Sequence, residues 1–289
     1  MKPIKMTTPV VVEPSAFTIG HGDRIMLIGS CFTENIGERL QSLRFPVMIN
    51  PFGILYNPLS IADALNRCID EVYIDEGDVV LHDGLYHSWI HHGSFSRKGR
   101  QQCIDECNKT LRQANIFLQQ CNTLVITLGS AWYYTYVGRV VANCHKVPAS
   151  SFEKHLSSVE EVVTVLKPVI DRLISRGIRV IFTVSPVRHN AYGAHGNQLG
   201  KAVLLLAIEQ LMKDYPAQEV AYFPSFEIIN DELRDYRFYA DDLLHPSAMA
   251  EEVIWQRFMQ TYMTEATIKD CDAIEKENRR LSHRPLHES

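Results

Sequence analysis

The sequence has no long apolar run and no block of basic residues, and each absence excludes a class of partner. No stretch is long enough to span a bilayer, and residues 1–14 contain no apolar core of signal-peptide length. We therefore expect no membrane partner and predict a cytoplasmic location. The formal net charge of −5, with mixed signs throughout, argues against a nucleic-acid partner and favours a small neutral or polar ligand. The pattern does not determine the oligomeric state.

The chain also lacks a cysteine framework. Its seven cysteines are odd in number and follow no tight spacing, which is typical of reduced thiols rather than of disulfides. They are Cys31, Cys68, Cys103, Cys107, Cys121, Cys144 and Cys271. At least one of them is a candidate for chemistry.

Apolar runs alternate with helical patterns along the 289 residues, whose 46% hydrophobic content suits one large core. The runs predict buried strands at residues 24–28, 46–49, 123–128, 179–184 and 219–223. Helices are predicted at residues 33–43, 59–69, 101–120, 158–175, 198–215 and 247–263. This order predicts an α/β fold with a five-stranded, mostly parallel sheet and helices on both faces.

Two insertions interrupt the alternation. Residues 78–96 indicate a hairpin around Asp83 and Gly84, and residues 132–142 indicate another around Gly138. We expect these insertions to form the wall of a pocket. We predict a single domain over residues 1–275, followed by a charged C-terminal tail at residues 276–289.

The most informative motif lies at the end of the first predicted strand. Apolar residues 25–28 lead into Gly29, Ser30 and Cys31, and a predicted helix follows. A strand that ends at a glycine and turns into a helix presents the next hydroxyl or thiol at the edge of the sheet. Ser30 and Cys31 are therefore candidate nucleophiles, and the helix N-terminus and a cationic histidine would lower the pKa of a thiol there. The alternative is a tight turn with a buried thiol.

Asp242 and His245 are the expected partners of that nucleophile. A histidine accepts the proton of the nucleophile, and a carboxylate fixes its tautomer and stabilises the imidazolium. Their spacing of three lets both face one pocket, with Pro246 beginning the next helix. The alternative for this pair is helix capping or a core hydrogen bond.

Polar residues after the other predicted strands complete the candidate set, because an open α/β sheet binds ligands at the carboxyl ends of its strands. These residues are Asn50, Gly53, Gly129, Ser130, Ser185 and Arg188. Together with the nucleophile, the base and the carboxylate, they favour acyl transfer.

Five segments also carry a family resemblance: residues 29–37 (GSCFTENIG), 50–58 (NPFGILYNP), 141–146 (VANCHK), 183–187 (TVSPV) and 235–239 (DYRFY). On these motifs the chain resembles the GSCFA family, with Thr33 where the family motif ends in alanine. It is more distantly similar to the SGNH (GDSL-type) hydrolases. The resemblance implies a flavodoxin-like, three-layer α/β/α sandwich and an esterase or O-acyltransferase that acts on an acyl ester, including one carried by a carbohydrate, without a cofactor.

The SGNH resemblance also implies roles for single residues. An ungapped match places Cys31 at the nucleophile position, and Gly53 resembles the glycine whose N–H helps to hold an oxyanion. The segment from Gly129 and Ser130 to residue 132 lacks the third-block asparagine of those hydrolases. Asn143 or Asn57 could replace it, and His145 is a further candidate for substrate binding.

Two other hypotheses remain open. The missing asparagine and the altered Gly-Asp-Ser block favour a non-catalytic ligand-binding protein that retains the pocket. Zinc is the rival chemistry, although we expect no metal, because structural zinc sites usually show paired cysteines at two-residue spacing. Its candidate ligands are His82, His87, His91, His92, Cys103 and Cys107. The aromatic residues of both insertions could stack on a sugar ring, although such residues more often pack across strands.

Overall fold

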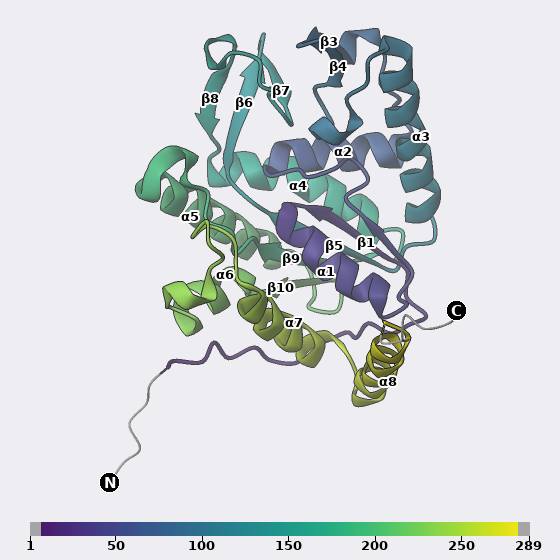
Figure 1. Ribbon diagram of the computed structural model, residues 1–289, viewed down its shortest axis with the longest axis vertical. Coiled ribbons are helices and arrows are strands. Elements are labelled where there is room, and N and C mark those ends of the chain that lie inside the picture. The colour runs from purple at the N-terminus through teal and green to yellow at the C-terminus, as the bar shows by residue number, and fades with distance from the viewer. Residues whose placement is uncertain (1–6, 283–289) are drawn as a thin grey trace, which may run out of the picture.

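A computed structural model describes residues 7–282 and places five parallel strands at the centre of the chain (Figure 1). The strands are β1 (Ile25–Gly29), β2 (Val47–Ile49), β5 (Thr123–Leu128), β9 (Arg179–Val184) and β10 (Val220–Phe223). Their order in the sheet is β10-β9-β5-β1-β2. All five predicted strands are confirmed, and the order is that of a flavodoxin-like doubly wound sheet.

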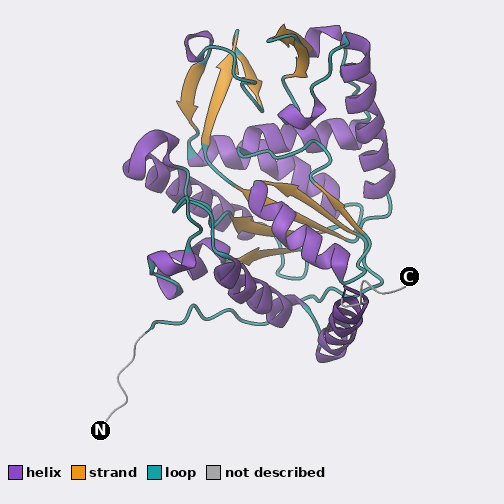
Figure 2. Cartoon of the chain, viewed as in Figure 1, coloured by secondary structure: helices purple, strands orange, loops and turns teal. Residues whose placement is uncertain are grey.

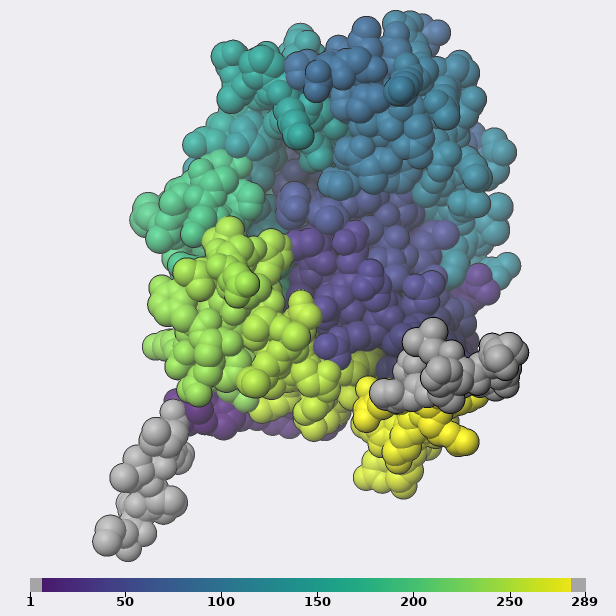
Figure 3. Space-filling model, viewed as in Figure 1, coloured from purple at the N-terminus to yellow at the C-terminus, as the bar shows by residue number. Residues whose placement is uncertain are grey.

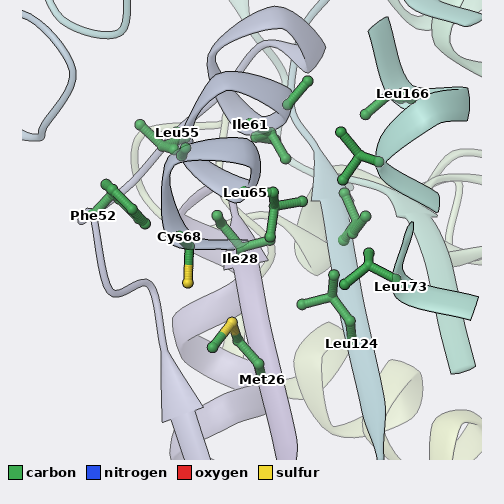
Figure 4. Close-up of a cluster of buried hydrophobic side chains, with 14 of the residues drawn as sticks. Met26, Ile28, Phe52, Leu55, Ile61, Leu65, Cys68, Leu124, Leu166 and Leu173 are labelled. Atoms are coloured by element: carbon green, nitrogen blue, oxygen red, sulfur yellow. The ribbon is translucent and has the colours of Figure 1, made fainter. Parts of the chain in front are cut away.

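Helices cover both faces of this sheet. Alternate side chains of β1 belong to different cores: Met26 and Ile28 lie in one, and Ile25 and Leu27 lie in the other. The first core is completed by α2 (Pro58–Asp70), α3 (Arg100–Leu118), α4 (Val159–Ile174) and α5 (Gly193–Met212). Figure 4 shows part of it, with labelled side chains from the sheet, α2 and α4 gathered in one cluster.

The second core lies under α1 (Cys31–Ser42), α7 (Ala248–Tyr262) and α8 (Glu265–Ser282). The three-layer α/β/α architecture is therefore confirmed. Helix α8 continues beyond residue 275 and contacts the end of α1: Asn278 donates to the carbonyl of Ser42, and Glu277 pairs with Arg44, which follows the helix. The rest of the predicted tail, residues 283–289, lies outside the described residues.

Both insertions form small antiparallel sheets, which lie at the same end of the molecule in Figures 1 and 2. The first is the predicted hairpin of β3 (Val79–His82) and β4 (Leu85–Ser88). The second contains the predicted pair β6 (Trp132–Tyr136) and β7 (Arg139–Val141), and an unpredicted third strand, β8 (Glu153–Leu156). Three of the four residues of β8 are polar or charged, so no apolar run marked it in the sequence.

Helix α8 begins at Glu265, before the predicted tail, and was not among the predicted helices, and two shorter segments were also not predicted. The short helix α6 (Ser225–Glu227) continues into a π-helical turn at Ile228–Glu232, and both follow β10. Across residues 7–282, no helix combines the length and the apolar character that crossing a bilayer requires.

Two buried histidines, His91 and His145, bond to Ser88 at the end of the first hairpin. A hydrogen bond of 2.9 Å joins His91 Nδ1 to Ser88 Oγ, and His145 Nε2 donates to the Ser88 carbonyl at 2.7 Å. His91 and His145 are buried, as are Cys103 and Cys107 on α3. Within residues 7–282, no group of three or more His, Cys, Asp or Glu side chains is arranged to hold a metal ion.

These buried histidines predict a fold that loses stability in acid. Burial lowers the pKa of His91 to about 3 and that of His145 to about 4, from an ordinary 6.5. Between about pH 6.5 and 4 the unfolded chain therefore binds more protons than the folded one. The free energy of unfolding should fall as the pH falls through this window, by up to about 1.4 kcal/mol per pH unit for each histidine.

Urea denaturation at a series of pH values measures this slope. His91→Phe should make it shallower, because one of the two titrating groups is removed, whereas His195→Asn at an exposed position should leave it unchanged. A slope that is the same in His91→Phe and in the wild type would contradict the prediction.

Candidate active site

The site begins where β1 presses against β5. Gly29 has φ +143°, and a Cβ at this position would lie 2.1 Å from the carbonyl oxygen of Thr127. Only glycine tolerates both the backbone conformation and the contact. The Ser30 N–H then donates to the Thr127 carbonyl at 3.1 Å, and the chain turns at once into α1, whose first residue is Cys31. The predicted strand–turn–helix arrangement is present.

Cys31, His245 and Asp242 form a chain of contacts across the ends of the sequence. Cys31 Sγ lies 3.6 Å from His245 Nε2, and His245 Nδ1 lies 2.6 Å from Asp242 Oδ2. In Figure 3 the late part of the chain, in yellow-green, lies directly against the early part, in purple. The three side chains therefore have the order of a nucleophile, a base and an orienting carboxylate.

A tight turn holds the carboxylate and the imidazole in this order. Asp242 Oδ1 accepts hydrogen bonds from the N–H groups of Leu244 and His245, at 2.9 and 3.0 Å. Leu243 adopts the left-handed conformation, with φ +58°, which lets the chain double back between the two residues. The cap of α7 is Ser247, which accepts from the Ala250 N–H. Asp242 therefore caps its own turn and orients His245, and another residue caps the helix.

The hydrogen bonds to Asp242 keep its carboxyl group ionised. The backbone N–H of His245, the ring of His245 and the Leu244 N–H together lower its pKa to about 2. An ionised Asp242 accepts a hydrogen bond from the Nδ1–H of the imidazole, which leaves the Nε2 lone pair directed at Cys31. The turn therefore selects the tautomer that can accept a proton from the thiol.

The thiol of Cys31 differs from the sequence expectation. Burial raises its pKa, and this effect outweighs the lowering by the N–H groups at the start of α1 and by the charge of Lys201. The expectation of a lowered pKa was therefore wrong, because it considered the helix terminus and ignored desolvation. A thiol of this kind depends on a base to become a nucleophile.

Ser30 is placed differently from its neighbour. Its side chain is 1% exposed, and its Oγ has no hydrogen-bond partner among the described residues. It occupies the N-cap position of α1, but its hydroxyl does not cap the helix. Of the two candidate nucleophiles, the structure brings only Cys31 to His245.

Gly53 and Asn57 follow β2, and their polar groups are already bonded. The Gly53 N–H donates to the Asn50 carbonyl at 2.7 Å, at φ +72°. Asn57 is the N-cap of α2: its Oδ1 accepts from the Ser60 N–H at 2.8 Å, and its Nδ2 donates to Ser60 Oγ at 3.0 Å. The Gly53 N–H is therefore already used in this arrangement, and the Asn57 amide serves as the cap of α2.

An aromatic cleft lies between the second insertion and the end of the main sheet. It has a volume of about 190 Å³ and contains the predicted residues Asn57, Ser130 and Asn143. Its remaining lining consists of Tyr56, Trp132, Tyr133, Tyr134, Val141, Ala142, Cys144, His189 and Tyr192. The second insertion therefore supplies much of the wall of a pocket, as expected.

Tyr56 connects this cleft with Cys31. Its carbonyl accepts hydrogen bonds from the N–H groups of Gly129 and Ser130, at 2.8 and 3.0 Å. Burial raises the pKa of its phenol, and a negative charge on Cys31 raises it further. Gly129 in turn contacts Ser30, since a Cβ on Gly129 would lie 3.3 Å from that of Ser30. Tyr56 therefore lines the cleft and senses the charge of the thiol, and neither Cys31 nor His245 is among the described residues that line the cleft.

His145 lies apart from this group. Its ring stacks on His87 with centroids 4.6 Å apart, and its Nε2–H donates to the Ser88 carbonyl. It is absent from the lining of the aromatic cleft among residues 7–282. Asn143 does line the cleft: its Oδ1 accepts from the His145 N–H, and its Nδ2 has no partner among the described residues.

A family model for the GSCFA family matches residues 24–258. The chain belongs to the GSCFA family. No curated protein matches the sequence of this GSCFA chain.

Solved structures with a similar arrangement are distant. A carbohydrate esterase family 3 protein from Talaromyces cellulolyticus is 10% identical, with a TM-score of 0.39 over 88% of this GSCFA chain and 99% of the other. A protein described as an acylhydrolase from Bacteroides fragilis is 10% identical, with a TM-score of 0.43 over 92% and 90% of the chains. A GDSL-like lipase from Bacteroides thetaiotaomicron is 12% identical, with a TM-score of 0.41 over 88% and 89%.

Three residues of this GSCFA site were missed in the sequence. His189 and Tyr192 reach the cleft from the loop after β9, and their rings lie 5.1 Å apart. Lys201 is buried below the site on α5. Its signal was available, because it stands three, seven and ten residues before Leu204, Ile208 and Leu211, on the face of a predicted helix that packs on the core.

Proposed function

We propose that this protein is an esterase or O-acyltransferase, with Cys31 as nucleophile, His245 as base and Asp242 as the residue that orients His245. The observation that carries the proposal is the chain of contacts at 3.6 and 2.6 Å that joins these three side chains. Such a chain is the arrangement in which a base can take the proton of a weak nucleophile.

In the proposed reaction, His245 Nε2 accepts the proton of the Cys31 thiol while the sulfur attacks the carbonyl carbon of an ester. The tetrahedral intermediate collapses with cleavage of the C–O bond, and the imidazolium returns the proton to the departing alcohol. This leaves a thioester on Cys31. Water or a second alcohol then attacks the thioester with His245 as base again, and the thiol is regenerated. Water gives hydrolysis, and an alcohol gives acyl transfer.

The oxyanion of the intermediate requires donors. The N–H groups of Cys31 and Phe32 are the first proposed donors, because they belong to the first turn of α1, where backbone donors have no helical partner. We propose the Nδ2 of Asn143 as a further donor, because it lines the cleft and has no partner among the described residues. Gly53 can donate only after it releases the Asn50 carbonyl.

The aromatic cleft is the proposed site for the organic part of the ester. Its aromatic rings offer flat apolar faces, while Ser130 and Asn143 add polar groups at the same cleft. Rings of this kind bind the apolar face of a sugar as well as a short acyl chain. The proposed substrates are therefore small-molecule acyl esters, including those of carbohydrates.

We also propose a cytoplasmic location, because all seven cysteines are free thiols, as a reducing compartment would keep them. Fractionation of cells that produce the protein should recover it with the cytosolic proteins. Recovery from the cell envelope or the medium would contradict this proposal.

Single substitutions distinguish the candidate nucleophiles. Turnover of p-nitrophenyl acetate and of an acetylated monosaccharide should fall roughly 10⁴-fold or more in Cys31→Ala. His245→Ala should lower it by about 10²–10⁴-fold, because the raised pKa of the thiol makes the base necessary. Ser30→Ala should stay close to the wild type, since it removes a buried hydroxyl that has no partner.

Intact-protein mass after acid quenching is the second readout of this experiment. The wild type should carry an acyl group that Cys31→Ala lacks. If the wild type is inert and unmodified with both esters, the enzyme proposal fails and a ligand-binding role takes its place. If Ser30→Ala is the inactive variant, the assignment of the nucleophile is wrong.

The two candidate asparagines should behave differently. Asn143→Ala should lower kcat by about 10²–10³-fold with a smaller change in KM, as expected for an oxyanion donor. Asn57→Ala should instead lower the free energy of unfolding by about 1 kcal/mol, because it removes the N-cap of α2. Steady-state kinetics and urea denaturation of both variants test this contrast, and equal losses of kcat would refute it.

A further inference from the structure

Lys201 is a buried cation that the proposed mechanism does not use. Its side chain is 2% exposed and lies on the face of α5 that packs against the sheet. Transfer of an ammonium group out of water is costly unless it is paired or well hydrogen-bonded. Among residues 7–282, no carboxylate forms a salt bridge with Lys201. The fold therefore retains a buried ammonium group at this position although its burial lowers stability.

The hydrogen bonds of Lys201 join two strands at the edge that carries the site. Its Nζ donates to the carbonyl of Gly129 at 2.9 Å and to that of Ser185 at 2.6 Å. These residues directly follow β5 and β9. A Cβ on Gly129 would lie 3.3 Å from that of Ser30, so Lys201 holds the carbonyl of a residue that packs beside the neighbour of the proposed nucleophile.

The charges of Cys31 and Lys201 each shift the pKa of the other group. Burial raises the pKa of Cys31, Glu34 raises it further, and the positive charge of Lys201 lowers it. Burial lowers the pKa of Lys201 to about 7, and a thiolate at Cys31 raises it. Burial and then the charge of Lys201 lower the pKa of His189. The other titratable groups at the thiol are Tyr56, whose pKa is raised, and His245.

We propose that Lys201 is a positioning residue of this site, which ties the ends of β5 and β9 together and supplies the positive charge that stabilises a thiolate at Cys31. The inference rests on the proposed role of Cys31 as the nucleophile. It explains why a cation without a carboxylate is retained below the site, where negative charge forms during acyl transfer.

The rate at which iodoacetamide alkylates Cys31 tests this inference without ester turnover. Peptide-resolved mass spectrometry should follow it from about pH 6 to about pH 8.5 in the wild type and in Lys201→Met. At about pH 6 the wild type should react roughly tenfold faster, because a nearby opposite charge shifts a pKa by about one unit. Near pH 8.5 the ratio should approach one, because Lys201 has then lost its proton.

Two further variants separate charge from structure. At the upper pH, Cys31 of Lys201→Arg should still be alkylated faster than Cys31 of Lys201→Met, since a guanidinium stays charged. Ile208→Ala, two turns along the same face of α5, creates a core defect and should leave the pH dependence of alkylation unchanged. A ratio between wild type and Lys201→Met that is constant with pH, or close to one throughout, would overturn the proposal.

A measurement without substitution of Lys201 covers the case in which its variants do not fold. In a His245→Ala background, the logarithm of the alkylation rate should rise with pH, flatten near pH 7 and rise again. A single uniform slope would overturn the proposal. If the alkylation results are as expected and the wild type hydrolyses no ester, the proposed function fails while the effect of Lys201 on Cys31 stands.

Discussion

The close contact between Gly29 and Thr127 is the constraint on which the rest of the site depends. The two strands approach so closely that a single methyl group on Gly29 would collide with the backbone of β5. This contact ends β1 and directs the chain into α1 within two residues. It therefore fixes three things together: the register of the central strands, the burial of Ser30 and the position of Cys31 at the mouth of the turn.

Asp242 and His245 are positioned by contacts within one turn, whereas the position of Cys31 depends on the packing of two strands. Asp242 and His245 hold each other through a turn of four residues, with hydrogen bonds to both backbone and ring. Their side chains remain 46% and 48% exposed, so this turn depends little on the core. The rigid sheet positions the thiol, and the exposed turn brings the imidazole to it. The contact between Cys31 and His245 joins the two, and the Arg188 N–H also ties the turn to the loop after β9 by donating to the Leu244 carbonyl at 3.0 Å.

This division explains how much could be predicted from the sequence. Strands and helices follow from apolar runs and capping signals, which are encoded locally, and the pairing of Cys31 with His245 was expected from two motifs that lie far apart in the sequence. The strand β8 and the placement of His145 could not be predicted, because a polar strand and a buried histidine are set by distant partners. The pKa of Cys31 was predicted with the wrong sign for the same reason, since desolvation is a property of the packed molecule.

The electrostatic effects at the site all act on the stability of a thiolate at Cys31. Desolvation at Cys31 opposes the thiolate, so a nucleophile here needs a base, a stabilising positive charge, or both. In the proposed mechanism His245 provides the first, with its tautomer set by an ionised Asp242. Lys201 is placed to provide the second from below, where no substrate can displace it. A site that suppresses its resting thiolate and stabilises negative charge only when it forms favours the transition state over the ground state, which is the condition for catalysis.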